Sequence, residues 1–473
     1  MSDSTGPAGG GADHSSGGSA PGVPETGATD PTEADLDATA VFEEGEDFDL
    51  RPGADSCYKC SACDVSCPVA EVDDDFPGPK FQGPEQWRLK QNEEDYGVDE
   101  SVMDCSNCMR CDDACPSGVP LSQMHNTARG QYVDGQMSRL SREYVRNRIL
   151  ANYRFFASVA STFPRLSTAV LNSRPVRWLN EKLLGISSDR EFPAFATETF
   201  REWWAARGGA AASRERAREA RGRRGESPEA DKKVAYFHGC YANYNTPEVG
   251  RALVRVFEHF GYELVVPEQR CSGTPMFANG MLADARRAAG LNVSSMADLV
   301  AEGYDAVASC TSCSMSLRQE YPELFDFEGV EEVAAHTFEA VEYLRIHEDL
   351  REEIRAGDVS GELAADFAYH APCHARNQGL DRQALELFRE LEGAGIEDVG
   401  DSCSGISGTY GWKAEKYEKS MAIGAEMFEH METAEGETGM TECPTCAMQM
   451  EHGTGYEVRH PLELLEAALV GGT

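Results

Sequence analysis

The sequence predicts an α+β multidomain protein in which a helical, cysteine-rich N-terminal domain precedes two copies of one α/β domain. From residue 232 onward, strand-like and helix-like segments alternate, which is typical of parallel sheets. In this part of the chain four cysteines occur twice, at offsets of 132 or 133 residues, and Ser272-Gly273 recurs as Ser404-Gly405. The pairs are Cys240 and Cys373, Cys271 and Cys403, Cys310 and Cys443, and Cys313 and Cys446. We therefore expect a duplicated domain.

The charge of the chain excludes one class of function. Of 473 residues, 81 are Asp or Glu and 43 are Lys or Arg, so the formal net charge is −38. Such a field repels nucleic acid, and we expect no nucleic-acid partner. Only nine of the basic residues are lysines, and an acid excess with scarce lysine resembles the composition of proteins from salt-loving archaea. The length suggests about three folded domains.

Residues 1–50 are rich in Gly, Ser, Thr, Pro and acidic residues, which predicts a disordered acidic tail. The first residues show neither the basic start nor the apolar segment of a secretory signal peptide, and no apolar run reaches the roughly 18 residues of a transmembrane helix. We therefore expect a protein of the cytoplasm, whose 16 cysteines stay reduced and bind metal rather than form disulfides.

Two cysteine runs lie in residues 51–145. Each has the spacing Cys-x2-Cys-x2-Cys-x3-Cys-Pro, which is typical of bacterial ferredoxins that bind two [4Fe–4S] clusters. The runs are Cys57, Cys60, Cys63 and Cys67, and Cys105, Cys108, Cys111 and Cys115. The fourth cysteine of such a run binds the other cluster, so Cys115 should complete the first set and Cys67 the second. Structural zinc sites use two Cys-x2-Cys pairs instead. The long connection of residues 68–104 predicts a helical two-cluster ferredoxin domain.

Residues 146–204 differ from the rest of the chain in charge. The stretch 145–225 holds 16 basic and 7 acidic residues, and its apolar residues recur near helical spacing. This pattern predicts basic amphipathic helices that contact a membrane surface or a partner, while ordinary packing against a neighbouring domain stays open. Residues 205–231, rich in Arg, Ala and Gly, are expected to form a linker.

Residues 232–346 and 347–473 are expected to hold the two copies of the α/β domain. The first copy should begin with a strand at Val234–His238, and Thr246-Pro247 should start a helix that Gly261 ends. The further elements expected are strands at 262–266, 306–308 and 367–370, helices at 283–300, 382–392 and 422–431, and a short strand before Cys443.

Each copy places its four cysteines near the ends of predicted strands. Open α/β sheets bind ligands at the carboxyl ends of their strands, so four thiolates that are distant in sequence can meet there. Such a set suits an iron–sulfur cluster, and it also suits a zinc ion. His238, His370 and His374 lie close to these cysteines in sequence; they either donate to cluster sulfur, replace a thiolate or simply pack nearby.

No motif of a substrate-binding, flavin-binding or nicotinamide-binding site is found. The sequence has no Gly-x-Gly-x-x-Gly after a predicted strand, no Walker loop and no Gly-x-Ser-x-Gly turn. Two clusters in one small domain pass single electrons. The sequence therefore indicates an electron relay without catalytic residues of its own, whose substrate is oxidised on another polypeptide.

These motifs together resemble the iron–sulfur C subunit of anaerobic glycerol-3-phosphate dehydrogenase, with the iron–sulfur subunit of glycolate oxidase and the B and D subunits of heterodisulfide reductase as cousins. A ferredoxin pair precedes duplicated cysteine-rich domains of the Cys-Cys-Gly (CCG) type. The signature stretches are 236–245, 408–411 and Thr445-Cys446 with Gln449, and the connecting segments are 176–186 and 200–203. The resemblance covers residues 50–473 and implies a two-cluster ferredoxin domain followed by two CCG-type domains.

The resemblance implies an electron-transfer subunit that accepts electrons from the flavin-containing A and B subunits of the glycerol-3-phosphate dehydrogenase and passes them to menaquinone in anaerobic respiration. It also implies that the basic helices hold the complex peripherally on the cytoplasmic side of the membrane. The chain departs from the pattern in one respect, because Ser272 and Ser404 stand where each Cys-Cys-Gly doublet has its second cysteine. Serine oxygen is a harder ligand for iron than thiolate. This departure argues against a five-cysteine, non-cubane cluster and against direct disulfide reduction.

Three alternatives stay open at this point. The chain can instead be the iron–sulfur subunit of a glycolate or lactate oxidase complex. It can be a thiol–disulfide reductase that acts at a C-terminal cluster, as the heterodisulfide reductase resemblance implies. In the third alternative the C-terminal domains are scaffolds held together by zinc.

Overall fold

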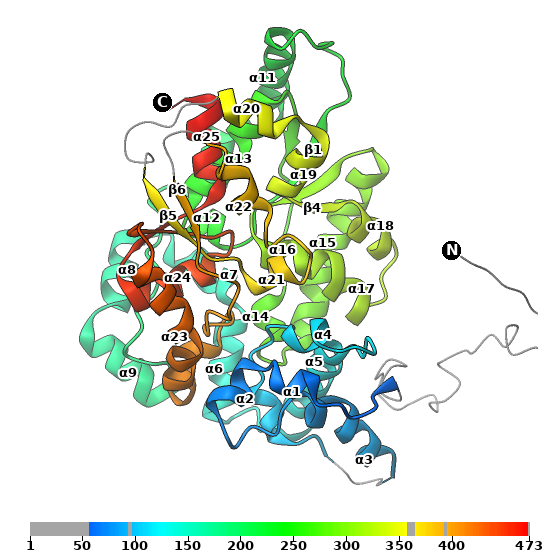
Figure 1. The fold of residues 1–473 in the computed structure, drawn as a ribbon, viewed down its shortest axis with the longest axis vertical. Coiled ribbons are helices and arrows are strands. Elements are labelled where there is room, and N and C mark those ends of the chain that lie inside the picture. Colours follow the sequence, from blue (N-terminus) through cyan, green and yellow to red (C-terminus); the bar gives the residue numbers. More distant parts are fainter. Residues whose placement is uncertain (1–55, 93–96, 357–364, 392–394, 472–473) are drawn as a thin grey trace, which may run out of the picture. The chain divides into compact units, whose positions relative to one another are not determined.

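The computed structural model describes residues 56–92, 97–356, 365–391 and 395–471 (Figure 1). The predicted acidic tail of residues 1–50 lies outside the described residues. Among the helices of the described ranges, none has both the length and the apolar character needed to cross a membrane.

The N-terminal domain is made of short helices and turns that surround its two cysteine runs. Its α-helices are α1 (Ala62–Val65), α2 (Pro68–Val72), α3 (Gln86–Asn92), α4 (Arg110–Asp113), α5 (Leu121–Gln131) and α6 (Arg142–Ala151). α1 and α4 lie inside the cysteine runs and have four residues each, which is too short for a helix to be stable alone. Tertiary contacts and bound ligands must therefore hold the runs in shape.

Three helices with a half-buried inner side follow this domain. They are α7 (Tyr153–Ala160), α8 (Pro164–Leu171) and α9 (Arg174–Leu184). The inner sides of α7 and α8 pack in a cluster with Phe195 and Tyr244. Leu184 of α9 packs in a separate cluster with Ile406 and Trp412. The next helix, α10 (Phe200–Ala206), begins with a capping box made by Thr199 and Glu202. Phe200 is fully buried in the core of the first repeat, so α10 fixes this segment to the α/β part of the chain.

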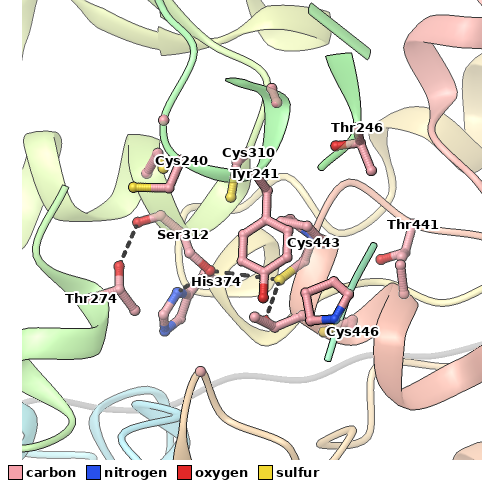
Figure 2. A pocket seen from close by; sticks show the side chains of 18 of the residues that line it. Cys240, Tyr241, Thr246, Thr274, Cys310, Ser312, His374, Thr441, Cys443 and Cys446 are labelled. Atoms are coloured by element: carbon pink, nitrogen blue, oxygen red, sulfur yellow. Dashed lines mark hydrogen bonds between the residues drawn. The ribbon is translucent and has the colours of Figure 1, made fainter. Parts of the chain in front are cut away.

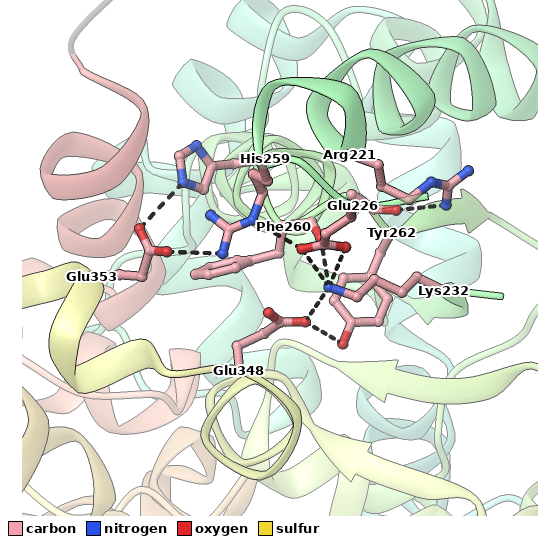
Figure 3. Close-up of polar contacts among 10 residues, drawn as sticks. Arg221, Glu226, Lys232, His259, Phe260, Tyr262, Glu348 and Glu353 are labelled. Atoms are coloured by element: carbon pink, nitrogen blue, oxygen red, sulfur yellow. Dashed lines mark hydrogen bonds and ion pairs between the residues drawn. The ribbon is translucent and has the colours of Figure 1, made fainter. Parts of the chain in front are cut away.

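The segment expected as a linker contains a helix instead. Helix α11 (Gly209–Arg223) buries Ser213, Ala217, Ala220 and Arg221 against the first repeat. At its end the Arg221 guanidinium donates to the Gly261 carbonyl and pairs with Glu263, at 2.8 and 2.9 Å. Figure 3 shows Arg221 beside the ion pairs of Lys232 with Glu226 and Glu348. Alanine and arginine are strong helix formers, so a composition that suggested a linker equally supports a packed helix.

The first repeat holds a four-stranded parallel sheet in the order β2-β1-β3-β4. Its strands are β1 (Lys233–Phe237), β2 (Glu263–Val265), β3 (Asp305–Ala308) and β4 (Thr337–Glu339). Its α-helices are α12 (Tyr241–Tyr244), α13 (Pro247–His259), α14 (Thr274–Phe277), α15 (Leu282–Ala301), α16 (Thr311–Met315), α17 (Tyr321–Leu324), α18 (Val330–Ala335), α19 (Ala340–His347) and α20 (Leu350–Ala356).

The second repeat has the same topology, with a parallel sheet in the order β6-β5-β7-β8. Its strands are β5 (Asp366–Tyr369), β6 (Gly395–Asp398), β7 (Thr438–Met440) and β8 (Glu457–Arg459). Its α-helices are α21 (Cys373–Arg376), α22 (Gln383–Phe388), α23 (Tyr417–Thr433), α24 (Pro444–Thr454) and α25 (Pro461–Val470). The predicted fold class, with its duplicated α/β domains, is confirmed.

Strands β4, β6 and β8 are absent from the sequence prediction. Each has three or four residues, and β6 and β8 are only partly buried, so none shows a clear pattern of alternating or continuous apolar residues. They pair at the edges of their sheets, where the neighbouring strand supplies the hydrogen bonds.

The two repeats share one hydrophobic core. Helix α25 of the second repeat packs against α13 of the first, and Leu253 and Phe257 of α13 lie in the same buried cluster as Leu464 and Leu465 of α25. Because this cluster also includes Tyr236 and other residues of both sheets, it fixes the orientation of one repeat relative to the other.

Candidate metal centres

The first thiol set lies in a small cavity of the N-terminal domain. Cys57, Cys60, Cys63 and Cys115 line this cavity together with Lys80. The backbone N–H of Val119 donates to the Cys115 Sγ at 3.4 Å. The structure thus brings together three cysteines of the first run and the last cysteine of the second, which is the grouping that the ferredoxin spacing predicts.

The second thiol set lines a neighbouring cavity. Cys67, Cys105, Cys108 and Cys111 surround it, and the backbone N–H of Asn107 donates to the Cys105 Sγ at 3.4 Å. His125 of α5 is fixed beside this set, with Nε2 3.0 Å from the Pro79 carbonyl and Nδ1 3.8 Å from the Cys105 Sγ. Its burial lowers its pKa, so the ring is neutral at pH 7.

The backbone of both runs has the same unusual conformation. Lys59 and Ser61 in the first run, and Asn107 and Met109 in the second, have φ of 63°, 64°, 58° and 61°. Residues other than glycine rarely adopt this left-handed region, and they concentrate where a ligand requires it. The repeated turns direct three thiols of one run toward one cavity, as a ligand loop for a metal cluster requires.

The raised pKa values of these thiols indicate that a bound cation is needed to stabilise their thiolate form. Burial raises the pKa of Cys63 and of Cys67 to about 12, with neighbouring Asp64 and Cys108 adding to the effect. Burial likewise raises the pKa of Cys111 well above its usual value. The thiolate form is therefore unfavourable by itself, and a positively charged metal centre compensates for this cost. Buried four-thiol sets fit iron–sulfur clusters on this ground.

All eight cysteines of the two repeats line a single cavity of about 360 Å³. Cys240 follows β1 and Cys373 follows β5, the two strands at which the strand order of each sheet reverses. Cys310 and Cys443 are the N-cap residues of α16 and α24. Ligands of open α/β sheets bind at such points. The cavity therefore lies where the strand-end cysteines are expected, but the two repeats contribute to one cavity rather than to two.

Thiols of the two repeats meet within this cavity. Cys310 of the first repeat and Cys443 of the second lie close together in the lining, and the charge of one affects the pKa of the other. The Ser312 hydroxyl lies 3.7 Å from the Cys443 Sγ and 3.0 Å from Nδ1 of His374, so it links both repeats. Figure 2 shows Cys240, Cys310 and Cys443 around the same space as Tyr241 and His374.

The two serines of the Cys-Ser-Gly turns face the cavity as well. The Ser404 hydroxyl donates to the Cys446 Sγ at 3.4 Å, and the Ser272 hydroxyl lies 3.4 Å from that of Thr274. The following Gly405 has φ of 85°, and a Cβ there would collide with the Ser420 carbonyl oxygen. Glycine is thus required in the turn, whereas the serine position supplies a hydroxyl beside the thiols.

The cavity of the second thiol set adjoins the cavity between the repeats. Ser106 and Asn107 line both cavities, and Cys108 and Cys403 lie in one buried cluster with Cys67 and Tyr410. The domains are also held together by an ion pair, because Arg376 pairs with Asp113 at 3.0 Å. The three thiol-lined cavities therefore form a series through the molecule.

The three histidines of the sequence prediction differ in position. His238 and His374 line the cavity between the repeats, whereas His370 is buried outside its lining. Burial lowers the pKa of His238 to about 3 and that of His370 to about 4, so both rings are neutral. In the described part of the chain, no three His, Cys, Asp or Glu side chains are grouped so that they could hold a single metal ion.

Comparisons with known proteins agree with this arrangement. Residues 53–119 match the model of a 4Fe-4S dicluster domain, and residues 234–318 and 367–451 each match that of a cysteine-rich domain. Over 419 residues the chain is 33% identical to the C subunit of anaerobic glycerol-3-phosphate dehydrogenase from Escherichia coli K12, and the match covers 88% of this chain and 98% of the relative. The chain belongs to this C-subunit family.

Two other relatives match a smaller part of the chain. The B subunit of fumarate reductase (CoM/CoB) from Methanothermobacter marburgensis is 29% identical over 50% of the chain and 46% of the relative. The lactate utilization protein A of Halalkalibacterium halodurans is 30% identical over 38% of the chain and 73% of the relative. The predicted resemblance to the C subunit is thus confirmed, and the chain is an iron–sulfur electron-transfer subunit related to it.

Some residues of this C-subunit family member's site are missing from the sequence prediction. His125 and Arg129 lie in α5, away from the cysteine motifs, and Arg129 donates to the carbonyls of Cys105 and Phe277 at 3.2 and 2.9 Å. No local pattern marks them, because their role depends on the contact between two domains. Tyr153 and Tyr241 stack at 5.4 Å on one wall of the cavity between the repeats. Tyr241 lies in the signature stretch 236–245, which was the available signal for it.

Proposed function

We propose that this chain is the iron–sulfur subunit of a membrane-associated anaerobic glycerol-3-phosphate dehydrogenase and carries electrons from a flavoprotein to menaquinone. The single observation that carries the proposal is the series of three neighbouring thiol-lined cavities, in which Cys108 of the second set and Cys403 of the repeats share one buried cluster. Electron transfer requires carriers that lie close together, and one chain here positions all of their ligands. The partner subunits supply the substrate site, since no catalytic residue is proposed in this chain.

The proposed ligands follow the three cavities. Cys57, Cys60, Cys63 and Cys115 would hold one [4Fe–4S] cluster, and Cys67, Cys105, Cys108 and Cys111 the other. The eight cysteines of the repeats would hold further iron–sulfur centres. When bound, such a cluster takes up and releases one electron. The chain's own groups tune this chemistry, because backbone N–H groups such as those of Val119 and Asn107 donate to thiolate sulfur.

The exposure of the cysteines supports an order of transfer. Cys60 is exposed, whereas the cysteines of the second set and of the repeats are buried or half-buried. The first set is therefore the one that a flavoprotein can approach, and the second set lies between it and the repeats. We propose that electrons enter at the first set and end at the cavity between the repeats.

The proposed contact with the membrane uses the outer side of α7–α9. Nine large apolar side chains are exposed there, and we call them the apolar face. They are Phe155, Phe156, Val159, Phe163, Leu166, Val170, Trp178, Leu179 and Leu183. Residues 153–184 also carry five basic residues and one acidic residue. Contiguous exposed apolar side chains with basic neighbours are typical of surfaces that insert into the membrane interface. We therefore propose a peripheral position on the cytoplasmic side of the membrane.

The test uses the full chain, purified without oxygen. It should contain about 16 iron atoms if all four thiol sets hold four-iron clusters, and about eight if only the N-terminal sets do. Glycerol 3-phosphate with its flavoprotein subunits should reduce these clusters, as measured by electron paramagnetic resonance. Fewer than about eight iron atoms, or no reduction by any flavoprotein partner, would disprove the proposal.

A second candidate function is favoured by the proximity of Cys310 and Cys443, since eight thiols around one cavity also suit a thiol–disulfide reductase. It predicts that the reduced chain cleaves a mixed disulfide.

The partner can instead be a glycolate-type or lactate-type flavoprotein. The assay of cluster reduction distinguishes this case, because only the matching hydroxy acid then reduces the clusters.

A further inference from the structure

The cavity between the repeats extends beyond its eight cysteines along an aromatic wall. This wall consists of Leu150, Tyr153, Phe192, Tyr241 and Trp412. The rings of Tyr153 and Tyr241 are nearly parallel, at 13° and 5.4 Å between centroids, and those of Phe192 and Trp412 lie 5.1 Å apart. Paired aromatic rings of this kind offer flat apolar surfaces against which a planar ring can stack.

The aromatic wall is connected to the helices that carry the apolar face. Tyr153 belongs to α7, the helix that exposes Phe155 and Phe156. Leu184, the last residue of α9, packs with Phe192 and Trp412. Leu150 and Phe192 are only half-buried, so the wall reaches the surface beside the apolar face. A lipophilic ligand can thus pass from a membrane at the apolar face to the cavity along apolar side chains.

A second part of the cavity lining is polar, and we call it the polar end. Thr246, Glu248, Thr441, Arg459 and Glu463 line it. Among the described residues, the buried Thr441 hydroxyl has no hydrogen-bond partner, and Thr246, at the N-cap of α13, makes no side-chain capping bond. Figure 2 shows both threonines on the same side of Tyr241. Two uncommitted hydroxyls of this kind suit the carbonyl oxygens of a ligand.

Two carboxyl groups at this end are suited to hold protons. Burial raises the pKa of Glu463, and the nearby charge of Glu248 adds to the effect. Glu248 is exposed, and partial desolvation raises the pKa of its carboxyl, so it lies between the cavity and solvent. Arg459 lies 3.4 Å from a Glu463 oxygen and keeps the pair in place. The polar end therefore connects the cavity to bulk water through groups that can pass protons.

We propose that the part of this cavity lined by the aromatic wall and the polar end binds the headgroup of an isoprenoid quinone. The inference deepens the proposed function and rests on it, because electrons reach the cavity only if the thiol sets carry them. The quinone takes two electrons, one at a time, that originate in the reduced flavin of the partner subunit. It also takes two protons, delivered at the Glu248 and Glu463 end and replaced from water, and leaves as the quinol. A soluble disulfide substrate would need neither the apolar entrance nor the aromatic wall.

The test is photoaffinity labelling of the full chain with its clusters, in lipid vesicles, with an azido-1,4-naphthoquinone that bears a short isoprenoid tail. Peptide mapping should place the label within residues 149–153, 192–193, 241–249 or 441–463. Leu150→Trp, which narrows the cavity where the aromatic wall reaches the surface, should lower labelling by about tenfold. Leu291→Trp, at an exposed position of α15 outside both the cavity and the apolar face, is the matched control and should leave labelling unchanged. Iron content and the paramagnetic spectrum verify that both variants are folded.

A second variant tests the polar end by a different readout. Glu463→Gln keeps the shape and the acceptor oxygen that caps α25, so labelling should persist. Oxidation of the reduced chain by the quinone should slow by about a hundredfold, as on the loss of a positioned proton donor. An unchanged rate would overturn the assigned proton role.

The outcomes separate this inference from the proposed function. If the quinone oxidises the reduced chain but the label lies outside the aromatic wall and Leu150→Trp has no effect, the site is wrong and the relay stands. If the quinone neither labels nor oxidises a chain that its flavoprotein does reduce, both the site and menaquinone as the acceptor are disproved.

Discussion

The thiol of Cys108, in the N-terminal domain, lies beside the thiol of Cys403, in the second repeat, within one buried cluster. These residues are 295 positions apart in the sequence, and each belongs to a different thiol-lined cavity. Both thiols lie in an apolar cluster with Cys67, Tyr410 and Ile423. This cluster joins the ferredoxin-type domain to the α/β repeats at the point where an electron would pass between them.

Replacement of Cys108 and replacement of Cys403 are predicted to remove different clusters. Cys108→Ala should remove the cluster of the second set, about four iron atoms, because it is a proposed ligand of that set. Cys403→Ala should leave both N-terminal clusters in place and affect only the centres of the repeats. Iron analysis and electron paramagnetic resonance of the two variants measure this difference. Loss of the same paramagnetic signal in both variants would contradict the assignment.

Double variants test whether the fourth cysteine of each run binds the cluster held by the other run. Cys67 and Cys105 line the same cavity, so Cys67→Ala combined with Cys105→Ala should lose no more iron than either single variant. Cys67→Ala combined with Cys57→Ala affects two cavities and should lose about twice as much, about eight atoms. The reverse result, about eight iron atoms lost with Cys67→Ala and Cys105→Ala but about four with Cys67→Ala and Cys57→Ala, would show that each run binds its own cluster with all four of its cysteines.

Much of this site follows from the sequence where ligands are local. The spacing of the two runs predicts the thiol sets that Cys67 and Cys115 complete, because only a few residues separate the other three cysteines of each set. The repeat offset predicts that Cys240 and Cys373 take equivalent positions after strands, since both follow the first strand of a duplicated sheet. Local geometry is sufficient for these predictions.

The remaining features depend on tertiary contacts that no local pattern encodes. The merging of both repeats into one cavity depends on the packing of α13 against α25. The proximity of Cys108 to Cys403 depends on how the N-terminal domain docks. Helix α11 has the composition of a linker, but burial of Ala217 and Arg221 makes it part of the fold. A single sequence contains no signal for any of these arrangements.

Arg129 is predicted to hold the N-terminal domain on the first repeat. Its fully buried guanidinium donates to Asn126, to the Phe277 carbonyl and to the Cys105 carbonyl. Arg129→Met keeps much of the volume but leaves these acceptors without a donor, which should cost roughly 3 kcal/mol or more. Thermal unfolding at one fixed scan rate should show a clearly lowered midpoint. Arg110→Met, at a half-buried arginine of the same domain, is the control and should change the midpoint much less.

Glu339 is predicted to make the stability depend on pH. It is fully buried at the start of α19, accepts hydrogen bonds from the Val341 and Glu342 amides and from Gln383, and burial raises its pKa to about 7. A carboxyl whose pKa is higher in the folded protein than in the unfolded chain binds its proton more tightly when folded. Its contribution to stability is therefore present below the unfolded pKa, near 4.5, and is lost as the pH rises through about 7.

Glu339→Gln removes this titration while keeping an acceptor oxygen for α19. The difference in unfolding midpoint between pH 5.5 and pH 8 should be smaller in the variant than in the unmodified protein. The variant should also be the more stable one at pH 8, by an amount on the order of 2 kcal/mol. Differential scanning calorimetry at both pH values measures this. If the two proteins lose stability in parallel as the pH rises, Glu339 does not titrate in this range.

The apolar face of α7–α9 is predicted to bind membranes through its side chains. Phe155 and Leu183 are 65% and 62% exposed, and each would contribute roughly 1.5–3 kcal/mol if buried in lipid. Phe155→Asp combined with Leu183→Asp should therefore abolish co-sedimentation with vesicles that contain anionic lipid. Val65→Asp is the matched control, because Val65 is 86% exposed but lies in the N-terminal domain, away from this face. It should leave vesicle binding unchanged.

Salt separates the two contributions to this binding. The basic residues of 153–184 attract anionic lipid only within a Debye length, about 10 Å at 0.1 M salt and about 3 Å at 1 M. Burial of apolar side chains is not screened in this way. Binding of the unmodified chain should therefore weaken only partly between 0.1 and 1 M salt, while an Arg165→Gln, Arg174→Gln variant should lose most of this salt dependence. Binding that disappears completely at high salt would show that the apolar side chains do not insert, and the apolar face would then be a surface for a protein partner.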